Sequence, residues 1–491
     1  MEEKLGMYIN GKWVQGKGGE RPIIEPATGD ILTVVSEASR EQVEEAVTAA
    51  KAAFEQGTWA CDLALRVGLL RRLAELLELS AEEFARLESQ NTGKPIRESR
   101  LDVSDSVACL RYYADLAESR QAWKKEMVDG TTSIVTEEPI GVCALIVPWN
   151  FPLLLGVWKL APALAAGNTV VFKPSEITPL SFLKLAILAE EVGIPAGVFN
   201  VVLGDGATAG QALVMSKDVD KVSFTGGSET GRKIYQECAR SLKRVSLELG
   251  GKSPLLVFAD ADVETAVDWA LFGSFFNQGQ VCVASSRLLV QQPLEGEFVA
   301  RLTERLQQLN IGNPLDEGTE IGPLASAQHL RKVEEYVRIG RAEGAALHTG
   351  GQRMEAKGGY YFMPAVFTGV DQQMRIVQEE IFGPVITVQS FANEEEAIEL
   401  ANGTVYGLAA GVLSRDVERA RRVASRLRAG TVWINGYHTP HLEAPWGGFK
   451  QSGIGRELGP HGLAAFTEAK HTNINAKLQP TGWFSLAERQ T

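Results

Sequence analysis

From residue 141 onward, short apolar runs alternate with segments of helical periodicity, and this alternation constrains the fold more than any other feature. The runs lie at Val142–Val147, Thr169–Phe172, Val198–Val202, Lys221–Phe224 and Leu255–Phe258. Short apolar strands separated by helices indicate an α/β fold, in which a parallel sheet is covered by helices on both faces. Such a sheet binds ligands at the carboxyl ends of its strands.

The pattern resumes in the second half of the chain and predicts a second α/β domain. Its strands are expected at Ser286–Val290, Ile386–Val388 and Thr431–Ile434. A chain of 491 residues exceeds a single core, which also favours two or three domains.

The N-terminal part has a different texture. Residues 7–14 predict a hairpin around Asn10-Gly11, a strong two-residue turn signal. From Ser39 to about Glu118 apolar residues recur at helical spacing. The segment from Asp102 to Ser106 is expected to open one of these helices, where acids favour the positive end of the helix dipole.

Composition excludes several classes of protein. A net charge of −12 with no basic stretch argues against nucleic acid as a partner. Five scattered cysteines do not form a disulfide framework, and they fit a reducing compartment such as the cytoplasm. Glu2 and Glu3 are untypical of a signal peptide. The most membrane-like window, 153–172, is interrupted by polar residues, so no membrane span is expected.

Three segments carry side chains suited to chemistry at a carbonyl group. Cys282 follows a Gly-containing turn, and a thiol attacks as thiolate if a substrate reaches it, although most free cysteines are only small buried hydrophobes. Glu248 precedes Gly250-Gly251 and becomes a base if burial raises its pKa. Asn150 lies between two prolines and can donate to a developing oxyanion. Together they suggest acyl chemistry.

These segments, in this order and spacing, resemble the aldehyde dehydrogenase superfamily, most closely the betaine and amino aldehyde dehydrogenases. The resemblance covers nearly the whole chain. It includes the motifs at 112–117, 158–168 and 445–453. It implies a Rossmann-like NAD-binding domain (1–120 and 140–250), an α/β catalytic domain (251–450) and a small β oligomerisation element (121–139 and 465–491). A homodimer or homotetramer is implied, although the tail after Ala465 reads as polar and irregular.

The resemblance also implies a mechanism. The Cys282 thiolate attacks the aldehyde, the Asn150 side chain and the Cys282 backbone N–H hold the oxyanion, and hydride passes to the nicotinamide. Glu248 then activates the water that hydrolyses the thioester. Lys159 and Glu457 match positions proposed to relay protons; a purely structural ion pair is the alternative.

The cofactor site rests on the same resemblance, because Gly-x-Gly-x-x-Gly is absent and the stretch at 226–233 departs from a P-loop. The turn at 224–228 would bring pyrophosphate to a helix N-terminus. Lys173 and Glu176 would hold the adenosine ribose, and a carboxylate there repels a 2′-phosphate, which predicts NAD over NADP. The full set of expected NAD contacts is Ile146, Pro148, Trp149, Lys173, Glu176, Gly206, Phe224, Gly227, Ser228, Leu249, Glu380 and Phe382.

Aromatic residues point to a cationic aldehyde. Trp158 and Trp446 match positions that surround a trimethylammonium group, while Phe151 and Phe276 stand where many members carry Tyr and Trp. Asp105 would attract the cation. The alternative is an apolar channel wall that takes a neutral or broad range of aldehydes. Betaine aldehyde or an ω-aminoaldehyde is favoured over succinate semialdehyde, since the matched motifs place no arginine for a carboxylate.

Other interpretations are disfavoured. His438 and His441 lie near Glu443, but the segment 436–440 is interpreted as a loop at the substrate mouth and no third nitrogen or sulfur ligand is close in sequence, so no metal site is expected. An acylating dehydrogenase that passes its thioester to coenzyme A would need a weaker water-activating base than Glu248. A non-enzymatic protein on this scaffold, comparable to lens crystallins, would have no need of Cys282, Glu248 and Asn150.

Overall fold

The computed structural model describes residues 6–355, 358–481 and 483–484. Glu2 and Glu3, which bear on the signal-peptide prediction, lie outside this range. So do residues 482 and 485–491 of the predicted oligomerisation element. Within the described residues, no helix combines the length and apolarity that a membrane span requires.

The first sheet has eight strands in the order β19-β11-β10-β7-β8-β9-β1-β2. Its parallel centre is formed by β7 (Val142–Ile146), β8 (Thr169–Lys173), β9 (Phe199–Val201), β10 (Lys221–Thr225) and β11 (Arg244–Glu248). The edges are antiparallel: β19 (Gly453–Ile454) on one side, and β1 (Met7–Ile9) with β2 (Lys12–Val14) on the other. The predicted hairpin is therefore confirmed, with Asn10 and Gly11 at positive φ.

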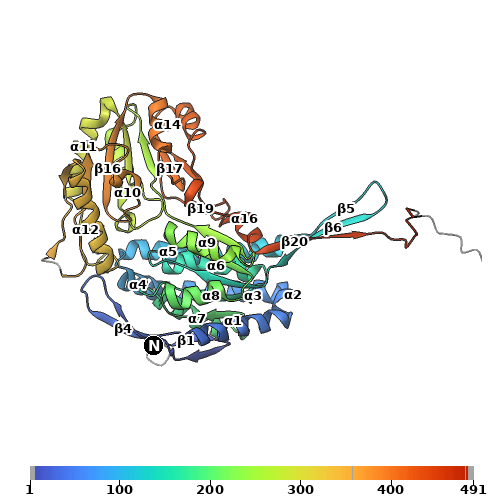
Figure 1. Cartoon of the computed structure of the whole chain (residues 1–491). Helices are drawn as coiled ribbons and strands as arrows, with labels where there is room; N and C mark the ends of the chain where they lie inside the picture. The colour runs from blue at the N-terminus through green and yellow to red at the C-terminus, as the bar shows by residue number, and fades with distance from the viewer. Residues whose placement is uncertain (1–5, 356–357, 482, 485–491) are drawn as a thin grey trace, which may run out of the picture.

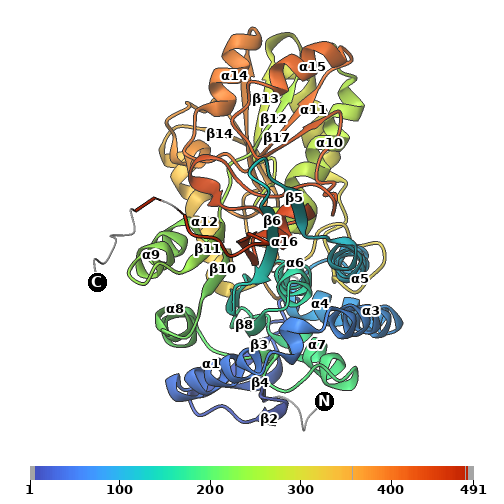
Figure 2. The same cartoon turned by 90° about the vertical axis from the view of Figure 1, so that its right-hand side faces the viewer.

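Helices cover both faces of this sheet (Figure 2). One face carries α1 (Arg40–Glu55), α8 (Gln211–Met215) and α9 (Ser228–Ala239). The other carries α6 (Pro152–Ala165) and α7 (Leu180–Glu191), backed by α2 (Thr58–Cys61), α3 (Leu63–Leu79), α4 (Ala81–Thr92) and α5 (Ile96–Ser119). A two-stranded ribbon, β3 (Gly19–Ile24) with β4 (Ile31–Glu37), lies outside.

One N-terminal expectation is wrong. Helix α5 begins at Ile96, directly after Pro95 at its N-cap, so residues 102–106 lie inside the helix and do not open it. Proline at a helix start fixes φ and loses no intrahelical hydrogen bond, which is why the boundary falls there. The helix dipole therefore does not explain Asp102 and Asp105.

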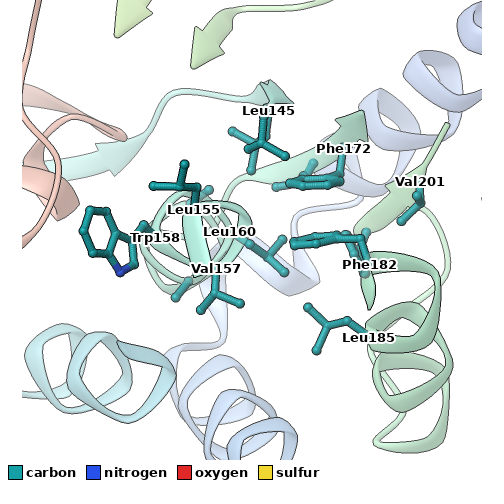
Figure 3. Close-up of a cluster of buried hydrophobic side chains, with 14 of the residues drawn as sticks. Leu145, Leu155, Val157, Trp158, Leu160, Phe172, Phe182, Leu185 and Val201 are labelled. Carbon is teal, nitrogen blue, oxygen red and sulfur yellow. The ribbon is translucent and has the colours of Figure 1, made fainter. Parts of the chain in front are cut away.

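Helix α6 connects the core to the site. Figure 3 shows Leu160 directed toward Phe172 and Phe182, whose rings stack at 3.5 Å, while Trp158 points the opposite way. Because all fourteen residues of the helix are buried, it has no solvated face. One side is fixed by the sheet, and the other presents Trp158 rigidly to a cavity.

The second sheet has seven strands in the order β14-β15-β16-β13-β12-β17-β18. They are β12 (Pro254–Val257), β13 (Arg287–Gln291), β15 (Ala365–Thr368), β16 (Val385–Phe391), β17 (Ala409–Leu413) and β18 (Thr431–Ile434), all parallel, with antiparallel β14 (Ala346–Thr349) at one edge. The helices around it are α10 (Val263–Phe275), α11 (Gln292–Gln307), α12 (Ala327–Ala342), α13 (Arg375–Gln378), α14 (Glu394–Asn402) and α15 (Val417–Ala424). A short helix, α16 (Gly459–Ala464), returns to the first sheet's helices.

A three-stranded arm projects from the body (Figure 1). It consists of β5 (Trp123–Glu126), β6 (Thr132–Pro139) and β20 (Thr467–Ile474), and β20 pairs with β6 along its whole length. The expectation of an irregular tail is wrong for 467–474. A strand exposed on both faces needs no apolar alternation, so its sequence pattern does not mark it.

Candidate active site

Two cavities meet at Cys282. One, of about 360 Å³, runs between α5, α6 and the loop at 438–446; the other, of about 800 Å³, opens over the carboxyl ends of β7, β10 and β11. Both are lined by Cys282, and they also share Leu155, Thr225 and Leu249. A nucleophile at this junction can face two ligands, one from each side.

A tight turn places Cys282. Asn277, Gln278 and Gly279 all have positive φ (48°, 57° and 69°), in a short 3₁₀ segment that follows α10. Gln280, which follows this turn, is tied to another loop, because its Oε1 accepts a hydrogen bond from the Ala325 N–H at 3.0 Å. Burial is the main cause that raises the pKa of the Cys282 thiol to about 12, and the carboxyls of Glu380 and Glu248 add to it. The resting group is therefore a thiol, which reacts only after a proton is removed.

Glycines at 250 and 251 allow the end of β11 to approach the segments that carry Cys282 and Glu380. A Cβ at Gly251 would lie 2.3 Å from the Cys282 carbonyl oxygen, and one at Gly250 would lie 2.3 Å from Oε2 of Glu380. No other residue fits these positions without moving backbone or carboxylate. The Gly-Gly pair next to Glu248 is thus required by packing around the nucleophile.

Asn150 lies in the loop after β7 and is 2% exposed. Its Nδ2 donates to the Gln280 carbonyl oxygen at 2.9 Å, and its own carbonyl accepts from Nδ2 of Asn277 at 3.0 Å. These bonds hold the amide against the segment that carries Cys282. An amide donor fixed in this way is suited to an oxyanion.

Glu248 ends β11 in the apolar cavity. It is 5% exposed, and within the described residues neither carboxyl oxygen has a hydrogen-bond partner. Burial raises its pKa well above the usual range, and the negative charge of Glu457 raises it further. Glu457 is itself bonded to Lys159 on α6, whose side chain is fully buried. The structure thus brings the predicted base, thiol, amide and ion pair together.

Aromatic rings form the wall of the smaller cavity. Trp158 and Trp446 meet edge to face at 5.5 Å, and Phe151 and Phe276 lie nearly parallel at 6.4 Å. Asp105 lines the same cavity, and burial raises the pKa of its carboxyl. All five predicted substrate residues therefore share one cavity.

Two further rings in this wall were not identified as substrate contacts from the sequence. The His438 ring lies 5.5 Å from Phe276 and 5.4 Å from Phe272, and its Nε2 is 3.0 Å from the Gly273 carbonyl oxygen. Positive φ at His438 turns the loop toward α10. The sequence predicted a loop at the substrate mouth at 436–440, and His438, Thr439 and Pro440 line the smaller cavity. The described residues contain no cluster of three or more His, Cys, Asp or Glu that could hold a metal ion.

The larger cavity contains seven of the predicted cofactor contacts: Pro148, Trp149, Glu176, Gly227, Leu249, Glu380 and Phe382. Five others lie outside its lining: Ile146, Lys173, Gly206, Phe224 and Ser228. Lys173 is 3% exposed and donates to the Pro174 carbonyl at 2.8 Å, with Nζ 4.0 Å from Glu176. It is a buried neighbour of the site and not a solvated strand end.

The donor set of this cavity fits a dinucleotide. Gly227 is the N-cap of the twelve-residue helix α9, and a Cβ there would meet nothing within 4 Å. The cavity is lined by Gly226 and Gly227 and by Glu229 and Thr230 of the first turn of that helix. Free N–H groups at a helix N-terminus bind phosphate. At the other end, Glu380 is held by the Gly251 N–H at 2.9 Å.

His329 is a lining residue that the sequence did not reveal. Its ring lies 4.9 Å from Trp149, and Nε2 is 2.6 Å from the carbonyl oxygen of Phe382, a residue with φ of 65°. Burial lowers the pKa of His329 to about 4. The start of α12 lies at the cavity because of tertiary packing, which no local sequence pattern indicates. Its lining residues are Ser326, Gln328, His329 and Lys332.

Comparison with known proteins agrees with this architecture. The model described as "Aldehyde dehydrogenase family" matches residues 13–472. The chain is 49% identical to betaine aldehyde dehydrogenase of Bacillus subtilis (strain 168), over 98% of this chain and 99% of that protein. It is 44% identical to aminoaldehyde dehydrogenase 2, peroxisomal, of Pisum sativum, over 97% of each chain.

A solved structure extends the likeness to three dimensions. Betaine aldehyde dehydrogenase from Staphylococcus aureus, in complex with NAD+, superposes with a TM-score of 0.96 at 44% identity, covering 98% of this chain and 97% of that one. The predicted fold class is confirmed. With two α/β sheets, a cysteine between two cavities and a family match over most of its length, this chain belongs to the aldehyde dehydrogenase family.

Proposed function

We propose that this chain oxidises betaine aldehyde to the corresponding acid with NAD, through a thioester on Cys282. The observation that carries the proposal is the position of Cys282, between an aromatic cavity and a cavity suited to a dinucleotide. The relatives named above for betaine aldehyde and aminoaldehydes support the choice. ω-Aminoaldehydes such as 4-aminobutyraldehyde are the alternative within the same cationic class.

In the first half-reaction the Cys282 thiol gives up its proton to solvent water, and the resulting thiolate sulfur forms a bond to the aldehyde carbon while the carbonyl electron pair moves onto oxygen. The Asn150 Nδ2 and the Cys282 backbone N–H donate to the oxygen as it gains negative charge, a contribution of about 3 kcal/mol per donor. Bound NAD supplies the acceptor for the hydride. Loss of that hydride leaves an acyl group on sulfur.

In the second half-reaction Glu248 removes a proton from water, and the resulting hydroxide attacks the thioester carbonyl. The carbon–sulfur bond then breaks and releases the acid. A carboxyl without hydrogen-bond partners in a dry site is a stronger base than an exposed one, because burial raises its pKa. The Glu457–Lys159 pair behind it would accept the proton from Glu248.

The cofactor would lie along the larger cavity. Glu176 and Lys173 would contact the adenosine ribose, the α9 N-terminus with Gly227 and Ser228 the pyrophosphate, and Glu380 with Phe382 the nicotinamide ribose and ring. Trp149 and Pro148 would cover it, with Ile146, Gly206, Phe224 and Leu249 shaping the pocket. A carboxylate at Glu176 disfavours the 2′-phosphate of NADP.

The substrate cation would lie among Trp158, Trp446, Phe151 and Phe276. Each aromatic face attracts a quaternary ammonium, and tryptophan does so best. Asp105, in the same cavity, adds negative charge when it is ionised. An aldehyde with a carboxylate would meet acidic and aromatic side chains here, which disfavours succinate semialdehyde.

The predicted domain division and assembly belong to the same proposal. Residues 1–120 and 140–250 would bind NAD, 251–450 would carry the nucleophile, and the arm of 121–139 and 465–491 would join subunits into a homodimer or homotetramer. Trp123, Met127 and Val128 expose apolar surface on the arm. All five cysteines are unpaired, which fits a reducing compartment such as the cytoplasm.

The test is a matched pair of aldehydes. We would measure initial rates of NADH formation with betaine aldehyde and with its neutral analogue, in which a carbon atom replaces the quaternary nitrogen. 4-Aminobutyraldehyde and succinate semialdehyde complete the panel, each also with NADP. We expect kcat/KM for betaine aldehyde to exceed that of the neutral analogue by roughly tenfold or more. Equal values would leave the proposed chemistry intact but contradict the proposal that the aromatic residues recognise a cation.

A further inference from the structure

A cluster of buried charges lies next to the turn that carries Cys282. Lys94, Glu98, Asp102 and Glu88 are at most 4% exposed, and Lys94 is bonded to Asp102. The proposed chemistry uses none of them. Burying four ionisable side chains is costly unless they form specific contacts, so their contacts indicate their role.

Glu98 reaches the turn directly. Its Oε2 accepts from the backbone N–H of Asn277 at 2.8 Å. Asn277 has φ of 48°, in the left-handed region that few residues other than glycine and asparagine adopt, and the Glu98 carboxyl is bonded to the backbone at this position. The neighbouring Gln278, with φ of 57°, donates from Nε2 to the Gly93 carbonyl at 3.1 Å.

The same turn is bonded to the amide donor. Asn277 Nδ2 donates to the Asn150 carbonyl oxygen at 3.0 Å, and Asn150 Nδ2 donates to the Gln280 carbonyl at 2.9 Å. A continuous path of hydrogen bonds therefore runs from Glu98 through Asn277 to Asn150, and along the backbone to Cys282.

The cluster also touches the substrate wall. Nζ of Lys94 lies 3.7 Å from the centroid of the Phe151 ring, which stacks on Phe276. Lys94 thus fixes one wall of the aromatic cavity while Glu98 fixes the loop beside it. Both residues belong to the short segment that ends α4 and begins α5.

We propose that Glu98 is a positioning residue: by holding the Asn277 turn it sets the two oxyanion donors, the Asn150 side chain and the Cys282 N–H, relative to the thiol. This rests on the proposed function of those donors. Without the carboxyl, the Asn277 N–H would be buried with no acceptor, and the strained turn would relax. A displacement of about 1 Å at a reacting group costs on the order of a hundredfold in rate.

Glu88 provides a matched control. It is 1% exposed, its pKa is raised to about 7 chiefly by burial, and it feels the same Lys94 charge. No hydrogen bond from Glu88 to the 276–282 turn occurs in the described structure, and its Oε2 has no partner there. Removing Glu88 should disturb packing and charge in the cluster but leave the turn in place.

The experiment compares Glu98→Gln, Glu98→Met and Glu88→Met in the full-length protein. The readout is hydrolysis of an activated ester, p-nitrophenyl acetate, which needs the thiol and the oxyanion donors but no hydride transfer. We expect Glu98→Met to lower kcat by about tenfold to a hundredfold with little change in KM. Glu98→Gln should restore most of the rate, because its amide oxygen can still accept from Asn277. Glu88→Met should lower Tm without that loss of kcat.

A second readout does not depend on turnover. Alkylation of Cys282 by iodoacetamide, followed by mass spectrometry, should be faster in Glu98→Met than in Glu98→Gln or Glu88→Met, since a released turn exposes the thiol. Equal behaviour of the Met and Gln variants at 98, in both readouts, would overturn the proposal. If wild-type protein fails to oxidise any aldehyde but these differences persist, the proposed function fails while the positioning role stands.

Discussion

The two sides of Cys282 use the same kind of side chain in opposite ways. Glu248, on the apolar side, is 5% exposed, and both its oxygens lack a hydrogen-bond partner in the described structure. Glu380, on the cofactor side, is fixed by the Gly251 N–H at 2.9 Å, and Lys332 and Lys252 offset part of the rise that burial causes in its pKa. A carboxyl without partners can take up a proton, whereas an anchored one is suited to hold a ligand. Environment and not residue type therefore assigns the two roles.

The largest expected effect tests whether the two sides act through one nucleophile. Cys282→Ala should abolish acid formation, a loss on the order of 10⁴-fold or more, because no other thiol lines either cavity of the described structure. NADH formation with betaine aldehyde measures it. Cys61→Ala, at an exposed position, is the control and should keep full activity. Substantial turnover by the Cys282 variant would remove the thioester mechanism.

The second prediction separates the two carboxyls. Glu248→Gln should slow thioester hydrolysis by about a hundredfold to a thousandfold and leave acylation fast, so a burst of NADH precedes a slow steady rate. Glu380→Gln should instead raise KM for NAD without a burst. Rapid mixing of each variant with aldehyde and NAD distinguishes the two. A burst in both variants, or in neither, would contradict the division of roles.

The pH dependence of the wild-type steady rate follows from the same environment. Glu248 acts in its ionised form, and burial places its pKa well above that of an ordinary carboxyl. Where hydrolysis limits the rate, activity should therefore fall on acidification at a pH well above the usual carboxyl range. That fall should be absent from the slow residual hydrolysis of Glu248→Gln. An unchanged profile in the variant would assign the ionisation to another group.

The sequence predicts those elements of the fold whose residue pattern is distinct within a few neighbouring positions. The strands around β7, β8, β10 and β13 were predicted because apolar runs buried on both faces are locally distinct. Strand β17 (Ala409–Leu413) was missed because its small residues carry little pattern. Strand β20 has no local pattern because neither face of the arm is buried, and only the family resemblance implied a β element there. The start of α5 was predicted too late, because the acidic residues at 102–106 resemble a first turn although Pro95 is the better start signal.

The site divides in the same way. Cys282, Glu248 and Asn150 lie in segments with unusual local composition, and the structure brings them together. His329 and Glu98 each lie in the first turn of a helix, where a single polar residue is ordinary in sequence; their hydrogen bonds to Phe382 and Asn277 come only from the tertiary fold. Such residues carry no local signal, because the partner that makes them useful is more than fifty residues away along the chain.

The fourth prediction uses one histidine from each side. Burial lowers the pKa of both His329 and His438 to about 4, so the unfolded chain binds protons more readily than the folded one between roughly pH 4 and 6.5. Stability is full above pH 6.5 and is lost as the pH falls, by about 2 kcal/mol at pH 5 for His329. His438 is more exposed than His329, so the loss of stability that its protonation causes should be smaller.

Thermal unfolding at pH 7 and pH 5 measures this loss. His329→Gln and His438→Gln should each narrow the difference in Tm between the two pH values, His329→Gln by more. Saturating NAD should protect the His329 side selectively, because only that residue lines the larger cavity. An identical pH dependence in both variants and in wild type would mean that folding does not lower the pKa of either ring.

The smallest effect concerns the character of the apolar side itself. If the aromatic wall recognises charge, Trp446→Ala should lower kcat/KM for betaine aldehyde roughly fivefold more than for its neutral analogue, about 1 kcal/mol of differential binding. Trp446→Phe should lose less, since a phenyl face is retained. Leu154→Ala, in the same cavity but without a π-face, should affect both aldehydes alike. The two substrates share shape and apolar area, so the packing lost in each truncation lowers both kcat/KM values alike and leaves their ratio unaffected. If Trp446→Ala leaves the ratio of kcat/KM for the two aldehydes unchanged, the aromatic wall selects substrates by shape alone. The two sides of Cys282 would then differ in polarity, but the apolar side would not recognise positive charge.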